Sequence, residues 1–156
     1  SGKPYRHYFG DGLCVSRHAN GKKREEGLRS DGLKEGVWRR WHPNGILSDR
    51  MEYLHGQLHG RWIEWHDNGR KISEVHFTRG EPDGIWYEWY EDGLRSKTGL
   101  YKLGERTGFW EGWYDNGRKW FRKAYRSGEL AGTCQWWMRD GTLQDEAFFI
   151  GGIPCN

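Results

Sequence analysis

Paired carboxylates are the first residues in the chain whose spacing could serve catalysis. Glu64 and Glu88 lie 24 residues apart, at the same place in two similar stretches of sequence. A glycosidase needs two carboxyl groups about 5–10 Å apart across a cleft. Nothing around these residues predicts a cleft that would shift a carboxyl pKa. The chain also lacks a phosphate-binding loop, a nucleophile elbow and a dinucleotide fingerprint. We therefore expect no enzyme and no cofactor.

Histidines raise the question of a metal site, because five of the seven lie between residues 42 and 76. His55, His59 and His66 come closest to a ligand set, but no spacing fixes three ligands in tetrahedral geometry. His42 and His66 stand where later units carry tyrosine, so we expect them to serve as rings. The three cysteines show neither metal-ligand spacing nor the even count of a disulfide framework. The sequence thus predicts no metal centre.

One basic and aromatic stretch is the candidate partner-binding surface. Its residues are Arg118, Lys119, Trp120, Phe121, Arg122, Lys123 and Arg126, with Trp136 nearby. Arginine and aromatic side chains carry much of the binding energy at protein interfaces. A regular strand would place Arg118, Trp120 and Arg122 on one face. It would place Lys119, Phe121 and Lys123 on the other. We hypothesise an interface for an acidic protein, with anionic lipid or nucleic acid as further ligands and packing against the last unit as the alternative.

A 24-residue repeat organises the rest of the sequence. A leading glycine recurs at Gly12, Gly36, Gly60, Gly84, Gly108 and Gly132. A turn glycine follows nine residues later in each unit, and a third glycine twenty residues after the first. Six units in one register predict a repeat array over residues 12–156, with residues 1–11 as a lead-in that covers its open end. The first unit has Cys14 and Arg17 in place of tryptophan, as suits an end unit with one neighbour.

Each unit predicts a β-hairpin. In the third unit, the ring-rich residues 62–66 precede Asn68-Gly69, and Asn-Gly tolerates positive φ at both turn positions. A second strand such as residues 70–77 follows, and then a polar, glycine-bearing connector. No segment has helical periodicity. Twelve strands side by side would extend about 55–60 Å. The predicted fold is all-β: an elongated, single-layer antiparallel sheet built from six 24-residue β-hairpin repeats.

Nine tryptophans form the predicted structural ladder. The first repeat position holds Trp38, Trp62, Trp86 and Trp110, and the second holds Trp41, Trp65, Trp89, Trp113 and Trp137. Rings that recur in each unit suit packing between hairpins; exposed platforms for sugars or bases are the alternative. Because the two positions are three residues apart, strict alternation places them on opposite faces. A bulge would instead turn both inward, and the sequence leaves both arrangements open.

The pattern Gly-x-Trp-x-x-Trp-[Tyr/His]-x-Asn-Gly, followed by an aromatic residue and Gly-x-x-x-Gly, resembles the bacterial MORN-repeat variant of YwqK-type antitoxin proteins. The resemblance runs from Gly12 onward, and the first unit departs from it at Cys14, Arg17 and Arg29. It implies a β-hairpin array that binds other proteins, in some cases a toxin that it neutralises. It does not imply an enzyme.

Bulk composition is compatible with such a module. Aromatic residues make up 16% of the chain, which argues against disorder. The 25 basic and 22 acidic residues are interspersed, which argues against a nucleic-acid partner. No apolar run reaches the roughly 18 residues that a membrane span needs. The compartment stays open between the cytoplasm and export with a leader removed.

The sequence therefore favours a non-catalytic module that binds a protein partner and masks it with a preformed sheet face. An antitoxin or immunity protein that covers a toxin is one such role. The alternative is a structural or cell-envelope scaffold that binds glycans through exposed tryptophans. Open sheet edges would also allow self-association.

Overall fold

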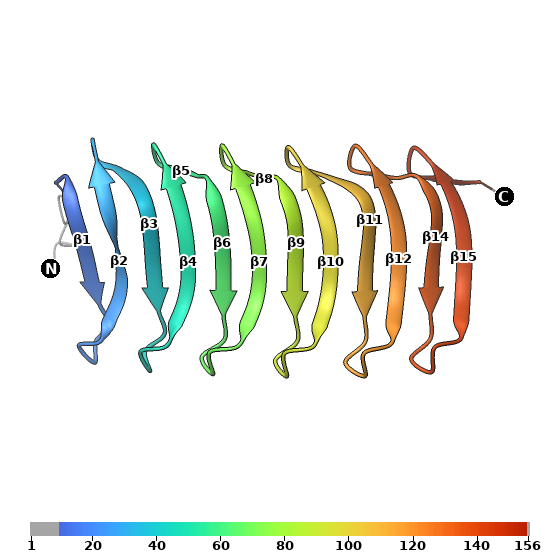
Figure 1. Ribbon diagram of the computed structural model, residues 1–156, viewed down its shortest axis with the longest axis horizontal. Helices are drawn as coiled ribbons and strands as arrows, with labels where there is room; N and C mark the ends of the chain where they lie inside the picture. The colour runs from blue at the N-terminus through green and yellow to red at the C-terminus, as the bar shows by residue number, and fades with distance from the viewer. Residues whose placement is uncertain (1–9, 156) are drawn as a thin grey trace, which may run out of the picture.

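The computed structural model describes residues 10–155, and every regular element in this range is a β-strand. The strands form a single open sheet in which neighbours along the chain are also neighbours in space and run antiparallel (Figure 1). The predicted all-β sheet of hairpin repeats is confirmed. The predicted lead-in lies outside the described residues except for Gly10 and Asp11, and the Asp11 carboxylate accepts a hydrogen bond from the Gly32 N–H.

Six hairpins succeed one another along the sheet. Their first strands are β1 (Gly12–Arg17), β3 (Leu33–Trp41), β6 (Gly60–Trp65), β9 (Gly84–Trp89), β11 (Glu105–Trp113) and β14 (Gly132–Trp137). Their second strands are β2 (Lys23–Ser30), β4 (Leu47–Leu54), β7 (Lys71–Thr78), β10 (Arg95–Lys102), β12 (Lys119–Arg126) and β15 (Leu143–Ile150).

The sheet has 16 strands rather than the expected twelve, because the connectors pair as well. Short strands β5 (Gln57–Leu58), β8 (Glu81–Pro82), β13 (Glu129–Leu130) and β16 (Ile153–Cys155) each fold back on the strand before them. In β3 and β11 the corresponding connector residues are continuous with the hairpin strand. The hairpin turns lie at one long side of the sheet and the connectors at the other (Figure 1).

The two kinds of turn differ from the expected geometry. Asn-Gly was expected to take positive φ at both residues, but in the hairpin turn only Gly69 does, at 83°. The Asn68 side chain instead accepts a hydrogen bond from the Arg70 N–H at 2.9 Å, which holds the turn without a left-handed asparagine. Two successive positive φ values occur in the connectors, where Arg79 and Gly80 have 53° and 85°. This pair forms the tight two-residue turn between β7 and β8.

A β-bulge in each hairpin decides which side chains share a face. In the third unit, Glu64 pairs with Ser73 and Trp65 pairs with Lys71, so Ile72 has no partner across the hairpin. The extra residue lies on the second strand, and the first strand keeps its alternation. Trp62 therefore lies on one face, here named face A, and Trp65 on the other, named face B. The open question from the sequence is answered: both faces carry indole rings.

Most of the core lies on face A, where the first-position rings meet the aromatic residues that end the second strands; Ile63 is a buried residue of face B. Trp38 and Trp110 are only 2% and 3% exposed. The Tyr101 ring, from the fourth hairpin, packs edge-on against Trp110 of the fifth, with ring centroids 4.9 Å apart. Trp86 contacts the same indole at 5.2 Å. These contacts join neighbouring hairpins, as expected for the first-position tryptophans.

The second-position tryptophans do not stack on one another within the described chain. They are half-buried on face B, where Trp89 contacts Tyr87 at 5.8 Å between centroids and lies under the Lys71 ammonium at 5.4 Å. On face A, by contrast, the first-position indoles Trp86 and Trp110 of neighbouring hairpins are in direct contact. The predicted ladder is thus two separate rows on opposite faces.

Hydrogen bonds between hairpin turns add a second lateral connection. The Tyr90 hydroxyl donates to the Trp113 carbonyl at 2.6 Å, and Tyr114 donates to the Trp137 carbonyl at 2.8 Å. At the same repeat position, the Nε2 of His42 lies 2.8 Å from the Trp65 carbonyl. His42 therefore serves as a ring that carries a hydrogen-bond donor.

No helix able to cross a bilayer occurs in residues 10–155.

Candidate binding surface

The basic and aromatic stretch 118–126 lies in β12 and is divided by the bulge. Gly112 pairs with Phe121 and Trp113 with Lys119, so the bulge residue is Trp120. The strict alternation expected from the sequence is therefore wrong. Trp120, Phe121 and Lys123 lie on face A, whereas Lys119 and Arg122 lie on face B, where both approach Glu111.

On face A, five side chains form a continuous group that we call the Trp120 cluster: Tyr114, Trp120, Phe121, Lys123 and Trp136. The Trp120 indole lies between Tyr114 and Phe121, at centroid distances of 6.1 Å and 5.1 Å. The Lys123 ammonium lies over Phe121 at 5.1 Å and over Trp136 at 5.5 Å. Phe121 and Trp136 are paired across neighbouring hairpins.

Phe121 and Trp120 have different environments within this cluster. Phe121 is 8% exposed, and its ring occupies the space that a Cβ on Gly112 would need. Packing within its own hairpin and against Trp136 of the last hairpin, the alternative noted from the sequence, thus accounts for Phe121. Trp120 is 41% exposed. At the equivalent bulge position Ser96 is 4% exposed, and its hydroxyl donates to Glu88. The bulge therefore accommodates a small residue, and the fold does not require an indole there.

Lys119 and Arg122, two basic residues of face B, are engaged within the chain. The Lys119 ammonium forms an ion pair with Glu111 at 2.7 Å. The Arg122 guanidinium lies over the Phe109 ring at 3.8 Å and approaches Glu111 at 3.8 Å. Arg118 donates to the Asp140 carbonyl in the hairpin turns, and Arg126 is exposed at the opposite end of the strand. The five bases therefore do not form one basic patch.

The candidates for catalysis and metal binding are distributed as follows. Glu64 accepts a hydrogen bond from Ser73 at 2.6 Å, and Glu88 accepts one from Lys97 at 2.9 Å. Both lie on the open surface of face A, one on each side of Ser73. His55 is in a connector and His66 in a hairpin turn, at opposite ends of the strands. Among residues 10–155, no three His, Cys, Asp or Glu side chains are placed to hold a metal ion.

Charge at the cluster's margin is also locally compensated. Arg139 donates to Asp115 in the neighbouring turn, and this hydrogen bond lowers the pKa of the Asp115 carboxyl. Lys123, by contrast, has aromatic rings as its recorded neighbours and no ion pair in the described chain. An exposed indole beside an unpaired ammonium is an arrangement that suits an acidic partner with an apolar centre.

Two stretches of the chain, residues 34–55 and 58–78, match a family model described as the MORN repeat variant. They contain the hairpins β3–β4 and β6–β7, whose 24-residue register the other hairpins share. No curated protein matches the chain. Among solved structures, the chain is similar to one in the crystal structure of accessory secretory protein 1, 2 and 3 in Streptococcus pneumoniae. The identity is 18% and the TM-score 0.30, over 75% of this chain and 19% of that one.

Proposed function

We propose that this array of MORN-variant hairpins is a non-catalytic module that binds a protein partner through the Trp120 cluster on face A. The observation that carries the proposal is the 41% exposure of the Trp120 indole, at a position where two other units have serine. A large ring held in place by neighbouring rings is the kind of anchor on which binding energy concentrates.

The sheet gives this anchor a fixed position. From β2 to β15, each main strand is paired with a neighbour on both sides, so the surface is formed before the partner arrives. Little conformational entropy is then lost on association. Lys123 adds a positive charge beside the rings and favours an acidic partner surface. The mode of action is steric and electrostatic masking, and an antitoxin or immunity role is its most specific form.

The test combines co-purification with a substitution that restores the residue of other units. Trp120→Ser reproduces Ser48 and Ser96 and should leave the melting temperature nearly unchanged, while the affinity for a co-purified partner falls at least about 10-fold. The matched control is Leu94→Ser, which removes an exposed apolar side chain from a hairpin turn. An unchanged affinity in Trp120→Ser would rule out this surface.

The scaffold alternative gives a different result. A glycan-binding scaffold would show fluorescence quenching on addition of cell-wall polysaccharide, and Trp120→Ser would abolish that signal. The same exposed indole supports this second reading, since sugars stack on aromatic rings. One tight protein partner without polysaccharide quenching would favour the protein-binding module.

A further inference from the structure

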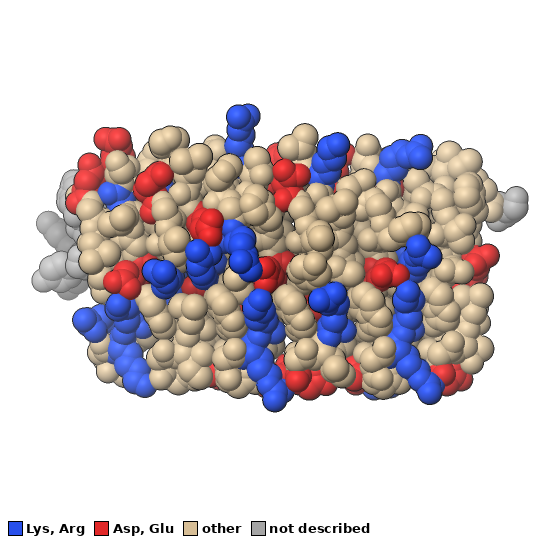
Figure 2. All heavy atoms as spheres, viewed as in Figure 1, with Lys and Arg blue, Asp and Glu red and all other residues tan. Residues whose placement is uncertain are grey.

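Face B carries an exposed apolar surface over the last three hairpins, separate from the Trp120 cluster. One row of face B side chains crosses β9 to β15, and its members, here named the apolar band, are Ile85, Leu100, Phe109, Ala124, Thr133 and Phe148. The row shifts between β10 and β11, where Leu100 pairs with Thr107 and Phe109 is the next face B residue of β11. Ile85 is 51% exposed, Phe109 53% and Phe148 49%. In Figure 2, uncharged side chains cover much of the surface just below the charged connector edge of these hairpins, whereas charged side chains gather over the hairpins before them.

The fold does not require an apolar row here. Arg61 and His76 of the third hairpin occupy the positions that Ile85 and Leu100 occupy in the fourth, and both hairpins have the same register. Polar side chains, one of them the charged Arg61, are therefore compatible with these positions. A contiguous exposed apolar row that packing does not demand indicates a contact surface.

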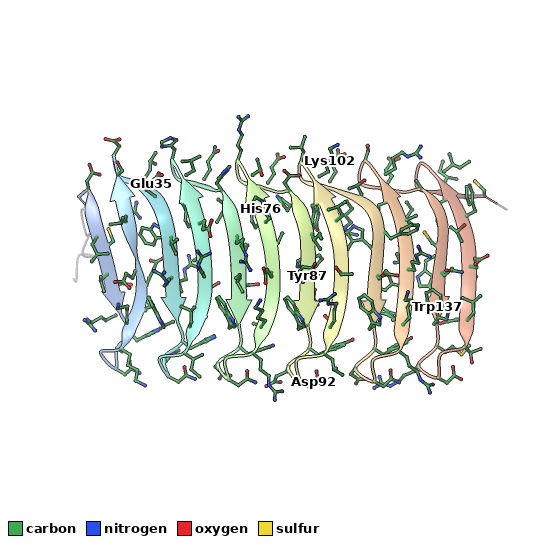
Figure 3. The ribbon with its side chains drawn as sticks, viewed as in Figure 1. Glu35, His76, Tyr87, Asp92, Lys102 and Trp137 are labelled. Carbon is green, nitrogen blue, oxygen red and sulfur yellow. The ribbon has the colours of Figure 1, made fainter. Side chains whose placement is uncertain are left out.

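The rim of the band carries charges of alternating sign. Lys102, Glu105, Arg126 and Glu129 follow one another along the connector side of the sheet, and all four are exposed. Glu105 opposes Lys102, and Glu129 opposes Arg126, across the connector turns. No ion pair within residues 10–155 includes any of the four. Figure 3 shows Lys102 at the connector end of β10, clear of the strands beside it. These charges are available to a partner.

Read in the opposite direction, this row of four charges has the opposite sign at each position. Two copies of the row that face each other in reversed order are therefore complementary. Consider a two-fold axis that runs parallel to the strands and lies in front of face B, between β11 and β12. Rotation about this axis would place face B of a second copy against face B of the first, with the order of the strands reversed. Lys102 would then face Glu129 of the second copy, and Glu105 would face Arg126 of the second copy. On the other side of the band, Glu111 would face Arg122 of the second copy. Closed two-fold dimers require such a self-complementary surface.

The same axis also matches side-chain sizes. It sets the large Phe109 against the small Ala124 of the second copy, and Leu100 against Thr133 of the second copy. Ile85 and Phe148, at the two ends of the band, face each other. The row spans six strands, about 24 Å at 4.8 Å per spacing, and sheets packed face to face lie about 10 Å apart. We infer that the apolar band is the interface of a two-fold homodimer, in which two sheets pack through face B.

The test measures the mass of the full chain in solution over about 1 to 500 µM, a range suited to micromolar association. We expect a concentration-dependent species of twice the 18.5 kDa chain mass. Phe109→Arg reproduces Arg61 of the third hairpin and should raise the dimer dissociation constant at least about 30-fold. Leu13→Arg, at the same repeat position in the first hairpin and outside the band, should leave it unchanged.

A charge exchange identifies the orientation. Lys102→Glu should weaken the dimer several-fold, and adding Glu129→Lys should restore it, because the two residues meet only between copies. Trp120→Ser should leave the dimer intact, since that residue lies on face A. A monomer at all concentrations would overturn the inference. So would a dimer that Phe109→Arg does not weaken, or a different protein held by the band of a monomeric chain. None of these results would affect the proposal for Trp120.

Discussion

The Trp110 indole lies directly against the backbone of Gly99, and a Cβ at that position would overlap the ring. The two residues come from successive hairpins, so the missing side chain of one strand makes room for the core ring of the next. Trp38 has the same relationship with Gly27 in the first two hairpins. At these two junctions between hairpins, lateral packing depends on a pair of a ring and a glycine.

Gly99→Ala should therefore destabilise the protein although it adds only one methyl group. The Trp110 ring is 3% exposed and is held by Trp86 and Tyr101, and we expect a loss of about 1–3 kcal/mol, as for other overpacked sites. Urea unfolding measures it. Gly10→Ala is the control, because a Cβ there meets open space. Equal stability of the two variants would contradict the packing described.

Trp110→Ala and Trp89→Ala should differ in cost, because the first indole is buried on face A and the second is half-buried on face B. We expect about 3–5 kcal/mol for Trp110→Ala, as for truncation of a core aromatic residue. The loss for Trp89→Ala should be less than half of this. The free energy of unfolding in denaturant gives both values. Similar losses would mean that the two faces contribute equally to the core.

Tyr90→Phe removes the hydroxyl that donates to the Trp113 carbonyl in the next hairpin. The expected cost is about 1 kcal/mol, the usual contribution of a neutral hydrogen bond. Tyr87→Phe is the matched control, since no hydrogen bond of the Tyr87 hydroxyl occurs among the described residues. If the two substitutions have the same effect on thermal unfolding, the turn-to-turn hydrogen bond does not stabilise the array.

Stability should fall at acidic pH through Glu74. Partial burial alone would raise the pKa of its carboxyl, but hydrogen bonds from Lys71 and Arg61 outweigh this and hold the pKa below 4.5. The unfolded chain therefore binds the proton more tightly, and the stabilisation present above pH 4.5 is lost as pH falls through the folded-state pKa. Melting temperatures between neutral pH and pH 3 should drop less steeply for Glu74→Gln. Glu91→Gln, in an exposed turn, should keep the wild-type slope.

The sequence was sufficient to predict the all-β sheet, its hairpins and their register, because glycines and rings recur at a fixed interval. It did not reveal the bulge, since no one residue type is common to the six bulge positions, which are Arg24, Ser48, Ile72, Ser96, Trp120 and Gln144. Because the bulge was not predicted, Trp120 and Arg122 of β12 were expected on the same face, whereas they lie on opposite faces. The spacing of the tryptophans contained a signal for the regularity of the first strand. Residues three apart on an extended strand lie on opposite faces without any irregularity, so the first strand needs no bulge.

The connector turns were missed for a related reason. Left-handed residues such as Arg79 and Leu103 belong to no type that favours positive φ. Their conformation follows from the pairing of short strands on either side, with Gly80 and Gly104 completing each turn. Tertiary pairing, rather than local preference, sets the backbone there.

Titration calorimetry of the co-purified partner against the wild-type chain and Trp120→Ser tests the central claim most directly. The claim predicts that the dissociation constant rises at least about 10-fold, the effect of losing one interface anchor, while the two chains melt at the same temperature. An unchanged dissociation constant, or a loss of binding that accompanies a large drop in melting temperature, would contradict it.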